Sequence, residues 1–402
     1  MDSRTLEYDV IIAGAGPAGS SAAIHLAING ARVLLVEQKK FPRAKLCGEF
    51  ISPECLKHFE RLGVEGEMLS AGGARLSQTV FYSRSGRSVK VPSSWFGNHE
   101  GALGLSRAEM DQRLIERARA IGVEIVEETQ AAGLLQRESR VCGAQLRSAD
   151  SQIECTAAVV IDATGRTRAL ARRLQAEKDH KRRRRPSLVA FKAHLENAHP
   201  ETATCEIYSY QGGYGGLSRI ENDLSNLCFI AAARNVRECE ADPERAMRAL
   251  VTQNSRASKT LANARVHDQW LAVTLESFGP QEPAPEPGLL MIGDAAAFID
   301  PFTGSGMLMA LEGGALAAKV ILDHLPALRN GESYTSLRRS YRKEYYEHFG
   351  NRLRVSAILR RAAYVPSFAE AVIRAVGVSD RLRYSLARAT RPKAINNMDR
   401  QI

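Results

Sequence analysis

The feature that most constrains this chain is a glycine-rich turn between a predicted strand and a predicted helix. Residues 8–13 are apolar and branched, residues 14–19 have the sequence GAGPAG, and residues 20–28 suit a helix. The first glycine of such a turn permits a tight bend, the second lets a pyrophosphate approach the backbone, and the third allows close helix–strand packing. The helix N-terminus offers free N–H groups to the phosphates. The pattern predicts a dinucleotide-binding loop formed by Gly14, Gly16, Pro17, Ala18 and Gly19.

An acidic residue in the right place supports this prediction. Glu37 ends the next predicted strand, residues 32–37, where a carboxylate accepts hydrogen bonds from the hydroxyls of a ribose. An acid at this position, in place of an arginine, disfavours a ribose that carries a 2′-phosphate. The two features together predict a dinucleotide but do not say which one.

Two distant segments narrow the choice. Residues 159–173 (VVIDATGRTRALARR) place a short turn after a buried strand, and residues 291–307 (MIGDAAAFIDPFTGSGM) place an acid and a glycine-bearing loop between a strand and a helix. The acid, Asp294, could hold ribitol or phosphate-side hydroxyls. The loop would present N–H groups and a helix N-terminus to a ring that carries negative charge, such as a reduced flavin. The candidate contacts are Thr164, Gly165, Gly293, Asp294, Pro301, Gly304, Ser305, Gly306 and Met307.

These three ordered motifs resemble the flavoprotein superfamily of para-hydroxybenzoate hydroxylase and the geranylgeranyl reductases. GAGPAG, the DATG turn and GDAAAFIDPFTGSG stand where that family has its dinucleotide fingerprint, its Asp-Gly motif and its Gly-Asp motif. The resemblance covers about residues 7–340 and implies that FAD is the cofactor. It also implies that Arg43 and Arg107 lie against the cofactor. Thr164 departs from the family pattern, which commonly has an Asp there.

The substrate side of the resemblance is less complete. KLCGEFISP (45–53) resembles the geranylgeranyl reductases, but GGYGGLSRIENDLSN (212–226) keeps only Tyr214 of their Tyr-x-Trp-x-Phe-Pro motif and does not resemble the Trp-x-Trp-x-Ile-Pro signature of flavin halogenases. The candidate catalytic residues are Cys47, Glu49 and Tyr214. A thiol at 47 could contact the flavin or donate a proton, and a carboxylate at 49 could orient the substrate. Alternatively, Cys47 fills apolar space and Glu49 caps a helix or forms a salt bridge.

The order of predicted elements defines the expected architecture. We expect an α/β fold in which a discontinuous Rossmann-like FAD-binding domain carries an inserted, mainly antiparallel β-sheet substrate domain and C-terminal helices. The expected bounds are 1–75, 101–179 and 270–333 for the FAD-binding domain, 76–100 and 180–269 for the substrate domain, and 334–402 for the helical region. The proline-rich segment 279–288 is expected to be a linker.

Composition limits the partners. The formal net charge of +10 fits an anionic partner, but the basic run at 181–185 comes with no nucleic-acid recognition fold or aromatic platform, so we expect no nucleic acid and leave peripheral membrane contact open. The seven cysteines contain no CxxC pair, which fits reduced thiols and no metal site. No stretch is long and apolar enough for a membrane span, and the first residues lack a secretory signal. We therefore expect a cytoplasmic protein of undetermined oligomeric state.

Three functions fit these features. The first is an FAD-dependent monooxygenase that hydroxylates a lipophilic or aromatic small molecule. The second is a geranylgeranyl-reductase-type enzyme that saturates prenyl double bonds. The third is a flavoprotein that only passes electrons to a partner protein or a quinone. The sequence has a single GxGxxG motif, so we expect no separate NAD(P)H domain. The resemblance to the hydroxylases implies that NAD(P)H binds only transiently, as the reductant.

Overall fold

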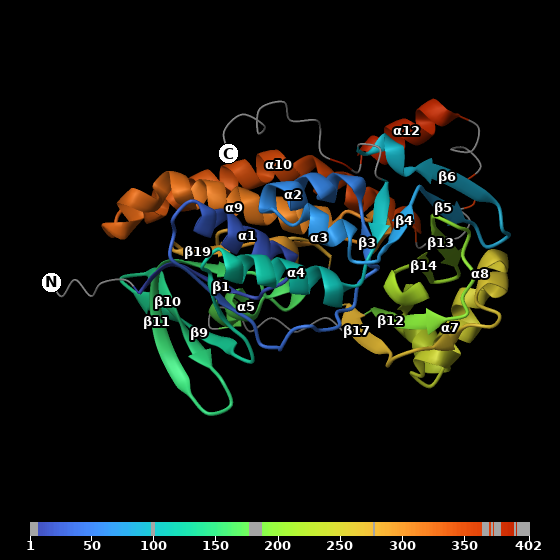
Figure 1. Cartoon of the computed structure of the whole chain (residues 1–402), viewed down its shortest axis with the longest axis horizontal. Coiled ribbons are helices and arrows are strands. Elements are labelled where there is room, and N and C mark those ends of the chain that lie inside the picture. The colour runs from blue at the N-terminus through green and yellow to red at the C-terminus, as the bar shows by residue number, and fades with distance from the viewer. Residues whose placement is uncertain are drawn as a thin grey trace.

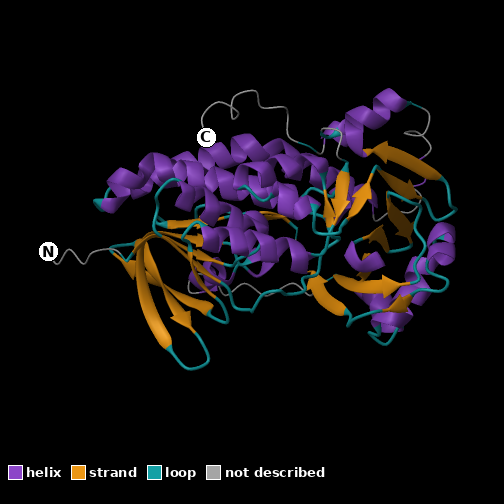
Figure 2. Cartoon of the chain, in the orientation of Figure 1, coloured by secondary structure: helices purple, strands orange, loops and turns teal. Residues whose placement is uncertain are grey.

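The computed structural model describes residues 7–97, 101–176, 187–275, 278–363, 370, 373, 379–389 and 391. The chain folds into two lobes (Figures 1 and 2). Helices and a mainly parallel sheet form one lobe, called here the parallel lobe, and a large antiparallel sheet with short helices forms the other, the antiparallel lobe. The basic run at 181–185 lies outside the described residues.

The parallel lobe is built on a seven-stranded sheet with the order β8-β2-β1-β11-β10-β9, in which β19 pairs with the end of β11. The central strands are continuous runs of Val, Ile and Leu, as expected for strands that are buried on both faces. Strand β11 is long enough to pair in parallel with β1 and antiparallel with β10. The strands are β1 (Tyr8–Ala13), β2 (Val33–Val36), β8 (Glu124–Val126), β9 (Gln130–Arg137), β10 (Arg140–Arg147), β11 (Gln152–Asp162) and β19 (Leu289–Met291).

Alternate residues of β1 belong to two different cores. Val10 and Ile12 pack with the helices α1 and α9, while Ile11 and Ala13 pack with β9, β10 and α5. Helices α1 and α9 approach very closely: a Cβ placed on Gly314 would lie 2.5 Å from the carbonyl oxygen of Ala18. The helices of this lobe are α1 (Pro17–Ile28), α2 (Pro53–Leu62), α3 (Glu65–Leu69), α4 (Arg107–Ala120), α5 (Ala169–Ala176), α9 (Gly306–Arg329) and α10 (Tyr334–Ala363).

Helix α10 carries an apolar stripe of residues spaced by three or four along the sequence. Tyr334, Leu337, Tyr341 and Tyr345 are all buried, and the hydroxyl of Tyr341 donates to the carbonyl oxygen of Met291, 2.8 Å away. Figure 1 shows α10 running along α9. This packing ties the late helices to the strand that precedes Asp294.

The antiparallel lobe contains an eight-stranded sheet of order β16-β12-β15-β14-β13-β5-β6, with β17 paired to β12. Only β5 and β13 pair in parallel. One face packs against short helices; the other faces the parallel lobe. The elements are β5 (Gln78–Tyr82), β6 (Ser88–Pro92), β12 (Leu188–Glu196), β13 (Thr204–Tyr210), β14 (Gly213–Arg219), β15 (Ser225–Ala232), β16 (Arg265–Val266), β17 (Leu271–Leu275), α6 (Ala233–Glu238), α7 (Pro243–Leu250) and α8 (Ser255–Thr260).

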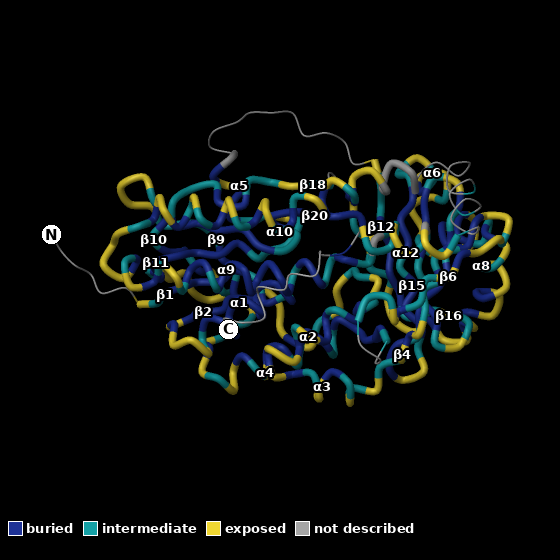
Figure 3. The backbone as a smooth tube through the Cα atoms, turned by 90° about the horizontal axis from the view of Figure 1, so that it is seen from above, coloured by how far each residue is buried: buried dark blue, intermediate teal, exposed yellow. Residues whose placement is uncertain are grey.

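Small elements join the lobes. Strands β3 (Phe50–Ile51), β4 (Ala74–Leu76) and β7 (Ala102–Gly104) form a three-stranded sheet. Helix α12 (Asp380–Ala389) lies against β6 at the top of the antiparallel lobe (Figure 1). Figure 3 shows that burial is concentrated in the centre of each lobe, with exposed turns at the rims. Within the described residues, no helix combines the length and apolar character that a membrane crossing requires.

The α/β architecture is confirmed, while two local predictions need correction. Segment 279–288 is more than a linker, because β18 (Gly279–Pro280) pairs with β20 (Ala297–Phe298) and the N–H of Met291 donates to Pro283. A strand of two residues at an edge tolerates proline. The helix expected at 20–28 already begins at Pro17, since proline suits the first turn of a helix.

Candidate functional site

A cavity of about 680 Å³ runs between the two lobes. At one end it is bounded by the glycine-rich turn after β1, and at the other by α12. The sheet of the antiparallel lobe forms one wall, because residues paired across neighbouring strands project to the same side. Ala190, Tyr214, Ile230 and Val273 are such partners, and all four line the cavity.

The three glycines of the turn have different surroundings. A Cβ on Gly14 would lie 2.4 Å from the carbonyl oxygen of Ala163, and a Cβ on Gly19 would lie 1.9 Å from that of Gly14. A Cβ on Gly16 would meet only the guanidinium of Arg107, at 3.6 Å. Gly14 and Gly19 are therefore required by the protein itself. Gly16 faces open cavity next to a cation, as a pyrophosphate-binding position should. Pro17 and Ala18 line the cavity beside it.

Glu37 and two arginines form a connected charge network beside the turn. One oxygen of Glu37 accepts from the N–H of Ala15 and from Arg43, both at 3.1 Å. Asp111 binds Arg43 at 3.2 Å and holds Arg107 through two contacts of 2.8 and 2.7 Å. Burial alone would lower the pKa of Arg107, but Asp111 outweighs burial and raises it. Both arginines line the cavity and are fixed in place by acids before any anion binds.

Thr164 contributes to the fold of the middle motif. Its hydroxyl donates to Asp162, 2.6 Å away, and accepts from the N–H of Ala169 at 2.7 Å. Asp162 also accepts from the N–H groups of Leu170 and Ala171 at the start of α5. The side chain that departs from the family pattern thus links β11 to α5. Gly165 follows with a positive φ of 72° and leaves open space at the cavity wall.

Within the described residues, the carboxylate of Asp294 has no hydrogen-bond partner. It lines the cavity directly after Gly293, and Arg107, Arg166 and Lys45 lie close enough to influence it. Burial raises the pKa of Asp294 from 3.8 to about 6, and these three cations only partly oppose the rise. An acceptor with no partner in a cavity fits a ligand that brings hydroxyl groups.

The loop before α9 places the remaining predicted contacts. Pro301, Gly304, Gly306 and Met307 line the cavity, and Ser305 is buried behind them. Asp300 accepts from the N–H of Phe302 at 3.0 Å and from the hydroxyl of Tyr214. The loop before α9 therefore holds the hydroxyl of Tyr214, and the ring of Tyr214 contacts Phe302 edge to face.

Cys47 and Glu49 lie on the cavity wall at the turn before β3. The backbone N–H of Glu49 points to the Sγ of Cys47, 3.4 Å away, and Asn226 donates to the carbonyl of Cys47 at 3.1 Å. Glu49 is fully buried with a positive φ of 52°. One of its oxygens binds Lys192 at 2.6 Å and the N–H of Arg107 at 2.8 Å, and the other binds His194 at 2.8 Å. These contacts match the second interpretation of Glu49, in which it forms a salt bridge and caps a helix.

Sequence reasoning missed Lys192, His194 and Asp300. Lys192 and His194 alternate along β12 with core residues, and their opposite neighbours on β15 are Cys228 and Asn226. Two polar residues spaced by two within an otherwise apolar strand were a usable signal for a charged cluster on one face. Among the described residues, no group of three His, Cys, Asp or Glu side chains could hold a metal ion.

The open position at Gly16, the fixed arginines and the unpartnered Asp294 fit a dinucleotide with a hydroxylated chain, and this site on this fold defines an FAD-dependent oxidoreductase. The chain belongs to the FAD binding domain family, which its sequence matches over residues 7–348.

Curated relatives extend over most of the chain. A digeranylgeranylglycerophospholipid reductase of Methanosarcina mazei is 27% identical over 361 residues, covering 88% of this chain and 84% of the relative. A menaquinone reductase of Mycolicibacterium smegmatis is 27% identical over 337 residues, covering 78% and 76%. Both relatives are reductases.

Solved structures share the fold. A flavin-dependent brominase superposes with a TM-score of 0.78 at 21% identity, covering 96% of this chain and 94% of its own. A geranylgeranyl bacteriochlorophyll reductase-like protein from Thermoplasma acidophilum gives 0.77 at 20% identity, covering 95% and 96%.

Proposed function

We propose that this protein uses FAD to saturate carbon–carbon double bonds in the prenyl chain of a lipid, with NAD(P)H as a transient reductant. This is the second function considered from the sequence. The names of the curated relatives, which are reductases of a prenylated lipid and of a quinone, support it over hydroxylation.

The observation that carries the proposal is the lining of the cavity beyond the cofactor motifs. There the antiparallel sheet and α12 contribute mainly apolar side chains, together with Arg383 and Arg391. A mainly apolar lining fits a hydrocarbon chain better than a compact polar substrate. The lining side chains of this part include Phe81, Val89, Val91, Phe96, Ile207 and Leu386.

The residues at the boundary between the two parts have assignable roles. When bound, FAD would supply the hydride that adds to one carbon of the double bond. The other carbon needs a proton, and the Cys47 thiol is a suitable donor because it lies on the cavity wall beside the cofactor motifs. Arg43, Arg107 and Asp294 would hold the cofactor, while Tyr214, held by Asp300, would position the substrate.

We also propose that the three parts of the chain expected from the sequence have separate functions. Segments 1–75, 101–179 and 270–333 would bind FAD, 76–100 and 180–269 would bind the lipid, and 334–402 would form the C-terminal helical region. A substrate of this kind resides in membranes, so we propose a cytoplasmic protein that contacts a membrane surface.

The test is anaerobic reoxidation of the reduced flavin by geranylgeranyl lipids. We expect the prenyl lipid to restore the spectrum of oxidised flavin and to gain two hydrogens per double bond, as measured by mass spectrometry. Geraniol-length and saturated lipids serve as controls. The proposal fails if reoxidation needs oxygen and the product gains an oxygen atom, which is the outcome of the hydroxylase hypothesis.

The first prediction is that Cys47→Ser retains FAD but reoxidises by lipid about 100-fold more slowly, because a serine hydroxyl is a much weaker acid than a thiol. Cys205→Ser is the matched control. Cys205 also lines the cavity, but burial raises the pKa of its thiol to about 12, so it should not donate a proton. Equal rates for wild type and Cys47→Ser would remove Cys47 from the chemistry.

A further inference from the structure

A chain of polar side chains connects the wall beside Cys47 to the outside of the protein. Glu49 is fully buried, Lys192 and His194 are 2% and 12% exposed, and Asp268 is 39% exposed. The Nε2 of His194 is 2.8 Å from Glu49, and its Nδ1 is 3.1 Å from Asp268. The described residues thus give this cluster a route to solvent through His194 and Asp268.

His194 lies between two carboxylates. Its Nε2 makes a hydrogen bond of 2.8 Å with Glu49, and its Nδ1 forms an ion-pair contact of 3.1 Å with Asp268. Asp268 also accepts from the backbone N–H of His194, at 3.2 Å, which holds the pair together. Two basic side chains, Lys192 and His194, thus face two carboxylates.

We infer that Asp268, His194, Glu49 and Lys192 form a proton relay that resupplies the cavity wall at Cys47 from solvent. The inference rests on the proposed function, in which each reduced double bond consumes one proton. The S–H bond of Cys47 breaks as a C–H bond forms on the substrate. The thiolate takes a proton from the Lys192 ammonium, and the His194 imidazolium replaces it through Glu49. His194 then takes a proton from solvent water at Asp268, and the hydroxide that remains leaves to bulk solvent, so every group of the relay regains its starting charge.

The electrostatics support the direction of transfer. Burial alone would raise the pKa of Glu49, but the hydrogen bond from His194 and the charge of Lys192 lower it. Glu49 therefore stays ionised between turnovers and passes protons without retaining them. Cys228, which is paired with Lys192 across the sheet, has its pKa raised by burial and next by Cys47, and lowered by Lys192. Cys47 and Lys192 are thus both neighbours of this thiol.

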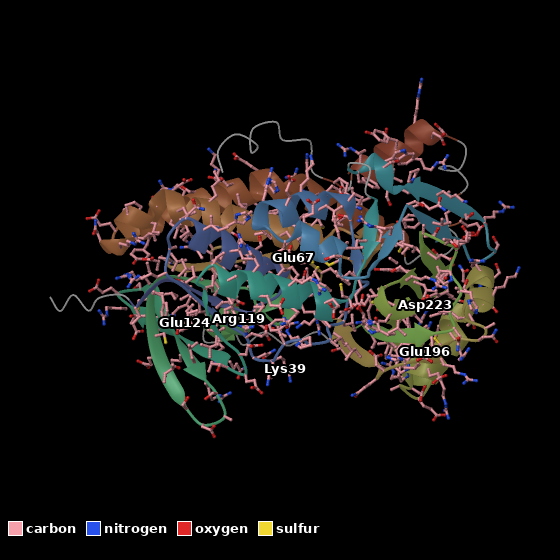
Figure 4. All side chains as sticks on the ribbon, in the orientation of Figure 1. Lys39, Glu67, Arg119, Glu124, Glu196 and Asp223 are labelled. Carbon is pink, nitrogen blue, oxygen red and sulfur yellow. The ribbon has the colours of Figure 1, made fainter. Side chains whose placement is uncertain are left out.

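Two variants interrupt the relay while preserving size and hydrogen bonding. His194→Gln removes the titrating ring, and Asp268→Asn removes the carboxylate at the entry. The neighbouring pair His267 and Glu196 supplies the control: its atoms are 2.7 Å apart, but the side chains are about half exposed and lie outside the cavity lining. Glu196 projects from the antiparallel lobe in Figure 4. His267→Gln therefore makes the same chemical change beside the relay, at a side chain that contacts Glu196 and takes no part in the proposed transfer.

The kinetic test separates the two half-reactions by anaerobic stopped flow. In both relay variants, we expect reoxidation of the flavin by prenyl lipid to slow by roughly tenfold or more and its solvent isotope effect in D2O to rise. Reduction of the flavin by dithionite and FAD affinity should match wild type. Imidazole should partly rescue a His194→Ala variant, which a structural role would not allow. Unchanged reoxidation in His194→Gln, or an equal loss in His267→Gln, overturns the relay.

A second readout needs no substrate. In the holoenzyme labelled with ¹⁵N-histidine, we expect the His194 signal, identified by its loss in His194→Gln, to show protons on both ring nitrogens near neutral pH. Asp268→Asn should remove the Nδ1 proton signal. A neutral His194 overturns the relay whatever the substrate is. Failure of wild-type enzyme to reduce any prenyl lipid instead rejects the proposed function, so the two failures are distinguishable.

Discussion

At the scale of single residues, the three glycines of the glycine-rich turn have different roles: the fold requires two of them, and ligand binding requires the third. Gly14 and Gly19 have backbone atoms where a Cβ would go, so any side chain there disturbs the turn itself. Gly16 has free space on its cavity side, and the nearest group is the fixed guanidinium of Arg107. A side chain at position 16 should therefore leave the stability of the apoprotein unchanged but weaken the binding of FAD.

The second prediction follows from this difference. Gly16→Val should fold with nearly the thermal stability of the wild-type apoprotein, but bind FAD about 100-fold more weakly, since overpacking a close contact costs about 3 kcal/mol. FAD titration by fluorescence and melting of the apoprotein measure the two effects. Gly66→Val, at an equally open glycine in α3, should bind FAD normally. Full FAD occupancy in Gly16→Val would refute the assignment of the pyrophosphate position.

Asp294 gives a third prediction, on pH dependence. Because folding raises its pKa from 3.8 to about 6, the ionised carboxylate destabilises the apoprotein above pH 6, and this penalty fades as the pH falls from 6 towards 3.8. Asp294→Asn should therefore raise the melting temperature of the apoprotein at pH 7.5 but hardly at pH 4.5. It should also weaken FAD binding. Asp323→Asn, on the exposed side of α9, should do neither; a melting temperature that Asp294→Asn leaves unchanged at pH 7.5 would contradict the argument.

At the scale of elements, α12 is the part of the chain that closes the far end of the cavity. Leu386 and Ala387 line the cavity, while the ring of Tyr384 packs edge-on against Trp95 with centroids 5.4 Å apart. Arg383 donates to the carbonyl of Lys90 on β6, at 3.3 Å. The helix is thus attached to the antiparallel lobe by Arg383 and Tyr384, and it contributes Leu386 and Ala387 together with Arg383 to the cavity lining.

The fourth prediction tests this element. Leu386→Glu should lower affinity for a prenyl lipid by roughly tenfold or more, because the carboxylate must lose water to share an apolar cavity. FAD binding should not change. The adjacent Ser385→Glu adds the same charge to an exposed position of α12 and should leave lipid binding intact. Lipid titration followed by the flavin spectrum provides the measurement, and equal behaviour of the two variants would show that α12 does not border the substrate.

Elements were predictable from sequence where periodicity and motif coincide. β13 (Thr204–Tyr210) and the start of α4 at Arg107 each follow a local sequence pattern. Helix α9 continues to Arg329 past Pro326, since tertiary packing on α1 and α10 outweighs the local cost of proline. The Glu49 contacts could not be predicted, because Lys192 and His194 are about 145 residues away and meet it only through the packing of the two lobes.

At the scale of the whole molecule, that cluster joins two separately formed cores. Glu49 belongs to the parallel lobe and accepts from the N-terminus of α4, whereas Lys192 and His194 belong to strand β12 of the other lobe. The charges lie where water is excluded, so each depends on the others for its stability. This buried ionic group thus fixes the position of the antiparallel sheet, which forms one wall of the cavity, relative to the cofactor motifs.

The fifth prediction compares this buried group with an exposed pair. Lys192→Met should destabilise the apoprotein by about 3 kcal/mol, because it leaves a buried carboxylate with less compensation. Arg113→Met, which breaks a partly exposed pair with Glu109 on α4, should cost at most about 1 kcal/mol. Urea unfolding measures both. Similar losses for the two variants would mean that Lys192 is not part of a coupled buried cluster.

The way the strands are distributed along the chain has a consequence for biosynthesis. β5 pairs in parallel with β13, whose residues are translated long afterwards, and β11 gains its partner β19 only when residue 291 has been made. The last wall of the cofactor site, the start of α9, emerges from the ribosome later still. The edges of β5 and β11 therefore remain unpaired while later residues are synthesised, and unpaired strand edges favour aggregation. Flavin can bind only after the start of α9 has been made, so cofactor loading follows the synthesis of all the strands of both large sheets.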